Sequence, residues 1–240
     1  MEQAAAYIAE TGASFSSYLA GYRKQRLKLL ETQGPEHPDT AQSLSNLALL
    51  YRFQGKYAEA EALYKRSLEI YEKAVGPNHP DTAIDLNGLA ELYRIQGRYQ
   101  VAEPLQRRAL AILEKALGPK HPDTTTSLNN LALLLDAQGK RAEAEPLYRQ
   151  ALAIWEKVLG PEHPNTALSL NNLALLVDGQ GKAAEAEHLY RRALAIHENV
   201  LGPEHPNTVL VRNNLIRFFR KQGHSAEADA LATAAKGKAE

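Results

Sequence analysis

One heptapeptide, Gly-Pro-x-His-Pro-(Asp/Asn)-Thr, recurs through this chain at a fixed spacing. Its five copies begin at Gly34, Gly76, Gly118, Gly160 and Gly202, so every interval is 42 residues. A fixed period of about 20–50 residues is the signature of a solenoid, in which each repeat packs only against its neighbours. The period therefore predicts one elongated array for the 240 residues rather than one or two globular domains.

Each repeat carries two segments with the pattern of an amphipathic helix. In the first repeat, apolar residues from Leu44 to Tyr51 recur at i, i+3, i+4 and i+7, which predicts a helix over residues 38–54. Gly55 can take the left-handed conformation that ends a helix, and a second helix is predicted over residues 57–75. Because the link between them is short, the two helices should run antiparallel, and the fold class should be all-α.

The two ends of the chain depart from this pattern. Residues 1–33 are irregular and predict a degenerate helical cap, whereas residues 34–235 hold about five repeats, the last of them truncated. Residues 236–240 are expected to form a frayed tail. In the last repeat Arg212 replaces the leucine of the earlier ones, and a polar residue at a core position is typical of a terminal cap.

The repeated core positions resemble those of the tetratricopeptide repeat. The 42-residue period, the heptapeptide linker and the Leu-Asn-Asn-Leu-Ala run at residues 128–132 are similar to the longer, kinesin light chain-type variant. This resemblance implies a right-handed α-α superhelix, a TPR solenoid of antiparallel helix pairs, in which the first helices line a concave groove. In the light-chain proteins that groove binds peptides. The consensus residues of the first repeat are Leu44, Leu47, Ala48, Tyr51, Ala60, Tyr64 and Ser67.

Apolar residues also occupy the side of each first helix that lies opposite its buried face. A strip of this kind, repeated along a stack of helices, is larger than a monomer usually exposes without a use. We therefore expect it to bind a partner, the alternative being that it packs against neighbouring first helices. The residues are Leu49, Leu133 and Leu175, then Phe53 and Ile95, then Ile84, Leu168 and Leu210.

Asparagines in the middle of the first helices are a second candidate for ligand contact. Asparagine is worse than alanine there by roughly 0.6 kcal/mol, because its side chain competes for the backbone. Its amide can read the backbone of an extended peptide, or it can be satisfied in a ladder between repeats. Both interpretations apply to the flanking set, Asn46, Asn130, Asn172 and Asn214. Ligand contact is favoured for the central set, Asn87, Asn129, Asn171 and Asn213.

The charges on the same side of the first helices change sign along the chain. Basic residues come first, acidic residues follow, and basic residues return. The pattern suggests a ligand with acidic ends and a basic or polar middle, and the alternative is a solvated face. The residues are Arg52 and Arg94, then Asp136 and Asp178, then Arg217, Arg220 and Lys221.

No pattern in the sequence indicates catalysis, a metal or a cofactor, so we expect no enzyme. The heptapeptide histidines recur once per repeat, about 10 Å apart, whereas metal ligands must lie within about 2–2.6 Å of one point. They are expected to be structural side chains at the helix start, where the Asp or Asn and the Thr cap the first turn. His197 is expected to be solvated and Trp155 to make an edge contact.

Composition narrows the class of partner. Lys+Arg and Asp+Glu are both 28, and zero net charge argues against non-specific nucleic-acid binding. The chain has no cysteine, no basic leader and no long apolar run, which favours a cytoplasmic protein that neither spans nor enters a membrane.

The expected function is a protein-interaction scaffold that binds an extended peptide or disordered segment in the groove of the first helices. The alternative is an assembly module, which self-associates or docks to a larger effector without recognising a free peptide. The partner is expected to be a protein or peptide, and the chain itself a monomer or weak homo-oligomer.

Overall fold

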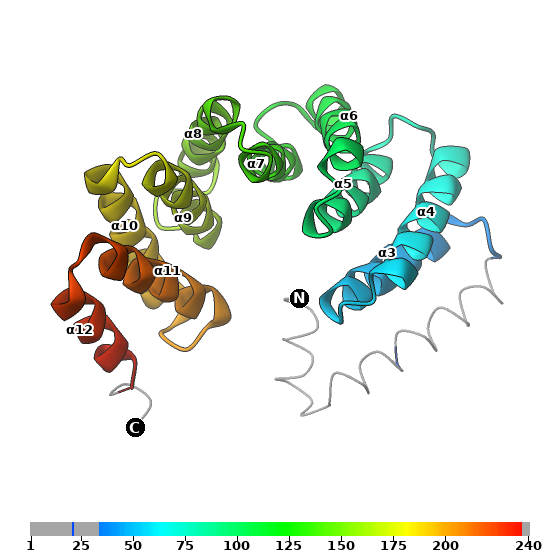
Figure 1. Cartoon of the computed structure of the whole chain (residues 1–240). Helices are drawn as coiled ribbons and strands as arrows, with labels where there is room; N and C mark the ends of the chain where they lie inside the picture. The colour runs from blue at the N-terminus through cyan, green and yellow to red at the C-terminus, as the bar shows by residue number, and fades with distance from the viewer. Residues whose placement is uncertain (1–20, 22–33, 237–240) are drawn as a thin grey trace. The chain divides into compact units, whose positions relative to one another are not determined.

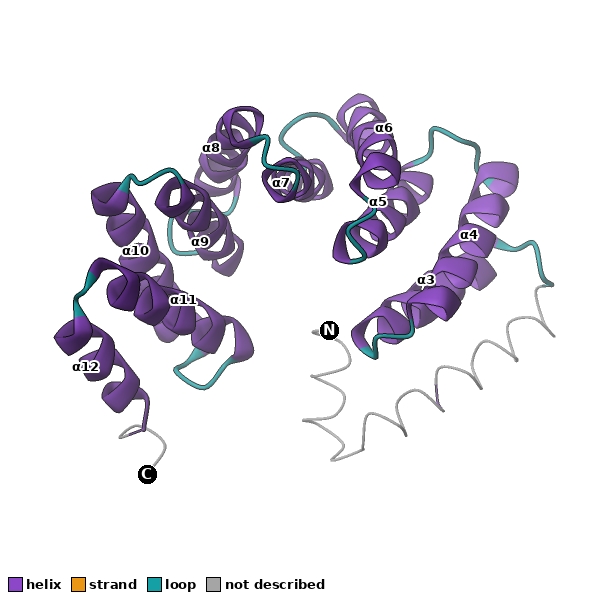
Figure 2. Cartoon of the chain, in the orientation of Figure 1, coloured by secondary structure: helices purple, strands orange, loops and turns teal. Residues whose placement is uncertain are grey.

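The computed structural model describes Gly21 and residues 34–236, apart from the side chains of 234–236. All regular structure within these residues is α-helical (Figure 2). The expected N-terminal cap lies outside the described residues except for Gly21, and so does nearly all of the expected tail. The helices are α3 (Pro38–Phe53), α4 (Tyr57–Ala74), α5 (Pro80–Ile95), α6 (Tyr99–Leu117), α7 (Pro122–Ala137), α8 (Arg141–Val158), α9 (Pro164–Gly179), α10 (Ala183–Leu201), α11 (Pro206–Gln222) and α12 (Ser225–Lys236) (Figure 1).

The odd-numbered helices are the first helices of the repeats, and the even-numbered helices are the second. The bounds of α3 and α4 fall within one residue of those predicted from the sequence. Within a repeat, α3 packs on α4, α5 on α6 and α9 on α10. Each second helix also packs on the next first helix, as α4 does on α5 and α10 does on α11.

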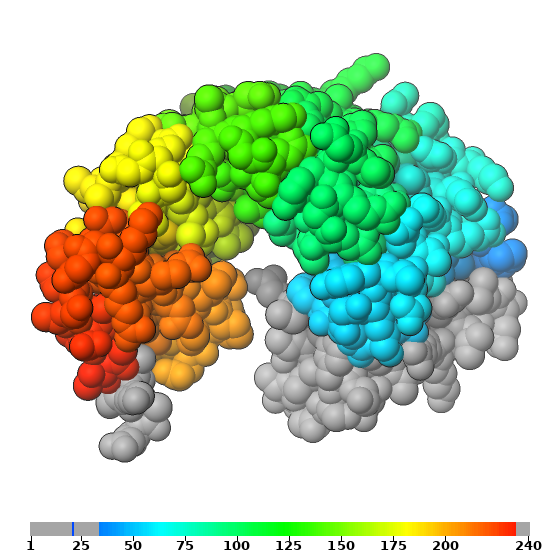
Figure 3. Space-filling model, in the orientation of Figure 1, coloured from blue at the N-terminus to red at the C-terminus, as the bar shows by residue number. Residues whose placement is uncertain are grey.

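The chain divides into two compact units, Met1–Ser127 and Leu128–Glu240, and the boundary falls inside α7. In the first unit, Ala83 and Leu86 of α5 pack with Ala109 and Leu113 of α6. In the second unit, the rings of Tyr190 and Phe218 lie 5.7 Å apart at their centroids. Fully buried alanines recur on the second helices and let helices approach closely, so the helices within each unit lie in close contact (Figure 3). They are Ala60, Ala102, Ala144 and Ala186.

Histidine, rather than the Asp, Asn or Thr that follows, caps each first helix. Nδ1 of His79 accepts a hydrogen bond from the backbone N–H of Asp81 at 3.3 Å, and the other four heptapeptides repeat this contact at 3.1–3.2 Å. The threonine has a different task, since Thr82 Oγ1 donates to the carbonyl of Gly76 at 2.8 Å. Gly76 itself has φ of 101°, a conformation that favours glycine. The heptapeptide is therefore a turn that is closed by its own threonine–glycine hydrogen bond and that contains a histidine N-cap.

Replacing His79 with alanine is expected to lower the free energy of unfolding by about 1 kcal/mol, because one amide in the first turn of α5 loses its acceptor. His79→Asp should recover most of this loss, since a carboxylate oxygen can accept the same bond. Urea unfolding followed by far-UV circular dichroism measures both. Asn78→Ala, one residue earlier and exposed, is the control. Equal stability of H79A and N78A would show that the cap contributes nothing.

Candidate functional site on the first helices

The first helices are α3, α5, α7, α9 and α11. In each unit taken by itself, the side of these helices that lies opposite their buried sides, called here the first-helix face, is partly apolar. In the first unit, Phe53 is 47% exposed, Ile84 45% and Ile95 41%, and in the second unit Leu210 is 48% exposed. Leu168 of the second unit is exposed as well. The leucines nearer the middle of the helices are half-buried, so they pack in part against their surroundings. They are Leu49, Leu133 and Leu175.

The asparagines of the second unit form a ladder between repeats. Asn214 Nδ2 donates to Asn171 Oδ1 at 2.9 Å, and Asn172 Nδ2 donates to Asn129 Oδ1 at 3.5 Å. Each bond joins a central asparagine to the flanking asparagine 43 residues later, which is one period plus one residue. The preference for ligand contact does not fit Asn171, which is 2% exposed and fully engaged in this ladder.

Position along the array explains the exposure of Asn213. It belongs to the last of the five first helices, so no later first helix supplies the partner that Asn171 finds in Asn214. Asn213 is exposed, and Asn130 is half-buried. Unlike Asn129, Asn171, Asn172 and Asn214, these two amides make no ladder bond within the described residues.

The first unit replaces the ladder with other polar contacts. Asn87 Oδ1 accepts from Gln106 Nε2 at 2.6 Å and from Ser127 Oγ at 2.8 Å. Half-buried Asn46 accepts a bond from Gln42 at 3.4 Å. Gly88 departs from the double-asparagine pattern, and a Cβ there would lie 2.6 Å from Cε1 of Tyr64. The buried tyrosine ring thus lies directly against the glycine backbone.

In the first unit, the two arginines that are candidates for ligand contact, Arg52 and Arg94, share one carboxylate. Arg94 donates to Glu91 through Nε at 2.6 Å and Nη2 at 2.9 Å, and Arg52 Nη1 lies 3.5 Å from the same group. Glu91 occupies the position of Leu49 in the first repeat and Leu133 in the third. The repeat register could have revealed this substitution, which neutralises much of the basic character predicted for this end.

Charges on the face of the second unit are also largely paired. Lys221 Nζ lies 2.8 Å from Asp178 Oδ1, and Arg141 Nε lies 3.4 Å from Asp136 Oδ1. Arg217 is exposed and donates to Asn214 at 3.2 Å. Arg220 and Asp229 are 3.7 Å apart with exposed side chains, so their ion pair contributes little. Arg217 and Arg220 are therefore exposed cations of the predicted set, whereas the side chains of Arg52 and Arg94 are only 14% and 23% exposed.

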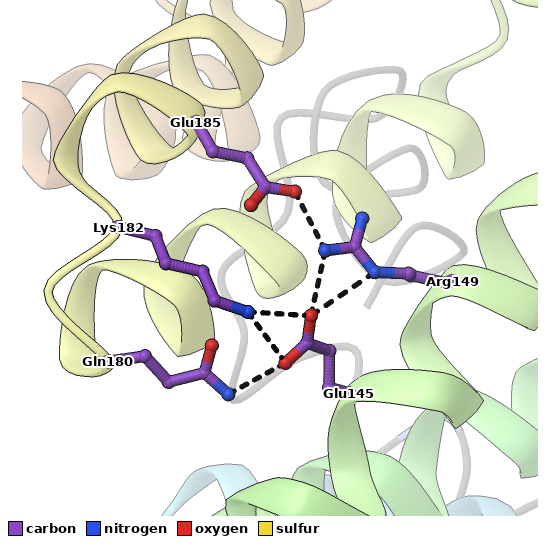
Figure 4. Close-up of polar contacts among 5 residues, drawn as sticks. All are labelled: Glu145, Arg149, Gln180, Lys182 and Glu185. Atoms are coloured by element: carbon purple, nitrogen blue, oxygen red, sulfur yellow. Dashed lines mark hydrogen bonds and ion pairs between the residues drawn. The ribbon is translucent and has the colours of Figure 1, made fainter.

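In the second unit, an ion network joins α8 to the turn between α9 and α10 and to α10 itself. Glu145 of α8 accepts bonds from Arg149 at 2.7 Å, Gln180 at 2.8 Å and Lys182 at 2.9 Å (Figure 4). Arg149 reaches on to Glu185 of α10 at 2.8 Å. The Lys182 and Arg149 cations lower the pKa of the Glu145 carboxyl to about 2. The carboxylate thus stays ionised and joins α8 to the C-terminal end of α9 and the start of α10.

Two expectations from the sequence are wrong. His197 is fully buried rather than solvated, its Nε2 lies 3.2 Å from the carbonyl of Pro164, and burial lowers its pKa. Trp155 is 3% exposed and belongs to the core rather than an edge. Both occupy the position of Tyr71 and Leu113, which are also buried. The shared register position was the signal for a further core residue in α4, α6, α8 and α10.

The described residues hold no group of three or more His, Cys, Asp or Glu side chains that could bind a metal ion. Nor is any helix in that part of the chain long and apolar enough to cross a membrane.

The tetratricopeptide repeat family matches this chain over residues 22–73, 39–115, 81–157, 137–199 and 179–235. No curated protein sequence matches it. Among solved structures, the chain is similar to the nearly identical TPR-like repeats of a Podosopora anserina protein described as a kinesin light chain. That structure has 31% identity and a TM-score of 0.69, and the match covers 84% of this chain and 95% of the other.

BtubC (BKLC) from P. vanneervenii has 25% identity and a TM-score of 0.73, with 92% of this chain and 87% of the other covered. A Rap protein complexed with Competence and Sporulation Factor shares the fold alone, at 17% identity and a TM-score of 0.69 over 90% of this chain and 62% of the other. These matches confirm the all-α superhelical repeat class and the likeness to kinesin light chain repeats. The chain belongs to the tetratricopeptide repeat family.

Proposed function

We propose that this protein is a non-enzymatic interaction module that binds an extended segment of a partner protein on its first-helix face. Tetratricopeptide repeat proteins are generally protein-interaction scaffolds, and the fold alone does not say which surface is used. The observation that carries the proposal is the recurrence of exposed apolar side chains at equivalent positions of consecutive first helices. Phe53 and Ile95 form one such pair, and Leu168 and Leu210 form another.

The polar groups around these apolar pairs are already held in place. Asn171 and Asn214 bond each other, and Glu91 fixes the arginine that precedes Ile95. A surface ordered in advance loses little conformational entropy on binding, so most of the ordering cost falls on the ligand. An extended segment suits such a surface, because its side chains can enter successive apolar positions.

The ion pairs within the protein narrow down where acidic residues of the ligand are expected to bind. Arg52 and Arg94 share Glu91, so they offer an acidic ligand less than their formal charge suggests. Arg217 and Arg220 are exposed on α11, close in sequence to exposed Asn213 and Leu210. We therefore expect acidic residues of the partner to bind at α11 rather than at α3 and α5.

Selection of a displayed random-peptide library on the immobilised chain tests this proposal. Leu168→Ala with Leu210→Ala should weaken binding of an enriched peptide at least tenfold, because removing each leucine side chain from an apolar interface costs about 1–2 kcal/mol. The matched control is Val158→Ala with Val200→Ala, which removes two equally exposed valines from the second helices. The control should change affinity less than twofold.

Failure to enrich any peptide, or equal weakening by both double variants, would contradict binding on this face. Sedimentation of the wild type and the Leu168/Leu210 variant addresses the alternative function. A chain that self-associates, and no longer does so after the leucine substitutions, would be an assembly module instead.

A further inference from the structure

A buried carboxyl group joins three helices of the first unit. Asp85 of α5 is 2% exposed, and its Oδ1 is in hydrogen-bond contact with Ser45 Oγ of α3. Ser45 Oγ lies 2.8 Å from Ser67 Oγ of α4, and Ser67 Oγ donates to the Ala41 carbonyl at 2.7 Å. The next two repeats carry Ser127 and Ser169 at the position of Asp85. An ionisable group has therefore replaced a neutral one at the junction of the first two repeats.

Counting protons shows which form of Asp85 fits this chain of contacts. The chain contains three oxygen–oxygen contacts, namely Asp85 to Ser45, Ser45 to Ser67, and Ser67 to the Ala41 carbonyl. Each contact needs one proton, and the two hydroxyl groups supply only two. A protonated Asp85 would supply the third by donating to Ser45 Oγ, which would then donate to Ser67, whereas an ionised Asp85 can only accept from Ser45. An ionised Asp85 would leave one of the short contacts without a proton.

The surroundings of Asp85 disfavour its charged form. Its Oδ2 is buried and has no hydrogen-bond partner within the described part of the chain. On its own helix the Asp81 carboxylate also raises the pKa of Asp85, and α6 presents apolar Ala109, Ile112 and Leu113 to the neighbouring residues of α5. Burial, opposed in part by the serine hydroxyls, raises the pKa of Asp85 to about 7.

The other helices bring no cation into direct contact with this carboxyl within the described residues. The Asp85 carboxyl acts electrostatically on the phenols of Tyr64 and Tyr71 of α4, and burial raises the pKa of both phenols. The charges that act on these phenols besides Asp85 are Asp39 and Arg52 of α3 and Asp81 and Glu91 of α5. Arg52 is engaged with Glu91.

We propose that Asp85 is a proton-controlled joint between the first two repeats. The joint is closed when Asp85 lies buried in contact with Ser45, and it is open when the carboxyl is exposed to water. Protonation of the carboxyl favours the closed state, and ionisation makes opening easier. In the closed state the carboxyl keeps its proton to about pH 7, whereas a solvated aspartate ionises near its ordinary value of 3.8. Because the closed state binds more protons between these values, opening becomes easier as pH rises from about 4 to about 7. Above that range both states are ionised, and the opening equilibrium should level off.

Hydrogen exchange of the full chain, measured by mass spectrometry from pH 5 to pH 8 and corrected for intrinsic rates, tests this joint. Protection of α3 and α5 should fall with rising pH, by up to about tenfold per pH unit for one linked proton, and level off above about pH 7. Asp85→Asn should abolish this dependence, because an amide can donate to Ser45 but cannot ionise. Asp39→Asn, at an exposed carboxylate of α3, should retain it. Helix α9, with Ser169 at the equivalent position, is the internal control.

Parallel pH profiles for the wild type and D85N would overturn the proposal. A second measurement needs no variant: the ¹³C resonance of the Asp85 carboxyl should titrate near pH 7 in the wild type. Titration near pH 4 would equally overturn it, whatever the stability of the substituted chains.

Discussion

Trp155→Ala is expected to lower the free energy of unfolding of the C-terminal unit by about 3–5 kcal/mol. The side chain is 3% exposed on α8, at the register position of Tyr71, Leu113 and His197, all of which are buried. Truncating a large buried aromatic residue loses its transfer free energy and leaves a cavity that the surrounding helices fill only in part. Because this is the only tryptophan, unfolding should be followed by far-UV circular dichroism rather than by fluorescence.

Two matched variants separate packing from other effects. Val158→Ala lies on the same helix at an exposed position and should change stability by less than about 0.5 kcal/mol. Trp155→Leu, which places the residue of the second repeat at this position, should be less destabilising than the alanine variant. If W155A were as stable as V158A, Trp155 would have no share in the core.

Arg212→Ala should lower the free energy of unfolding by about 2–3 kcal/mol, somewhat less than for a fully buried ion pair. The Arg212 side chain is 6% exposed and lies 3.0 Å from Glu198, whose side chain is 31% exposed. The guanidinium also donates to the carbonyl of Pro203 at 3.0 Å. Removing it leaves a partly buried carboxylate and a carbonyl without their donor, and it also removes the packing of the arginine stem.

Arg212→Leu should behave differently, because leucine fills this core position in the four earlier repeats. We expect its stability to lie within about 1 kcal/mol of the wild type, since apolar replacement of a buried ion pair is often neutral. Arg220→Ala, at a side chain 62% exposed, is the control. Urea unfolding measures all three, and equal losses of stability for R212A and R212L would show that packing volume at this site is unimportant.

Periodicity in the sequence predicted the fold of this protein well. The heptapeptide sets the register, and apolar spacing from Leu44 to Tyr51 defines a helix to within one residue of α3. Such signals are local, because helix caps, turns and amphipathic faces depend on residues a few positions apart. The same register identified Arg212 as a departure at the end of the array, and the structure shows it buried there.

The candidate site was predicted less completely, because its polar groups form hydrogen bonds and ion pairs with residues of other repeats. The sequence left open whether the flanking asparagines hydrogen-bond to asparagines of the neighbouring repeat or to a ligand. In the second unit, Asn214 bonds Asn171 and Asn172 bonds Asn129. The sequence suggested that Arg52 and Arg94 either meet an acidic ligand or belong to a solvated face, yet both contact Glu91. A helical wheel treats each helix alone, so it cannot show which amides and charges are satisfied across a repeat boundary.

The sequence by itself determined the repeat length, the helix pairs and the family, since these follow from spacing and turn chemistry within a single repeat. Only the tertiary structure decided which polar residues are committed to the fold. Whether Asp85 keeps its proton, and whether His197 meets water, depends on how much solvent the packed neighbours exclude. That exclusion is a property of several helices together, and no single repeat contains it.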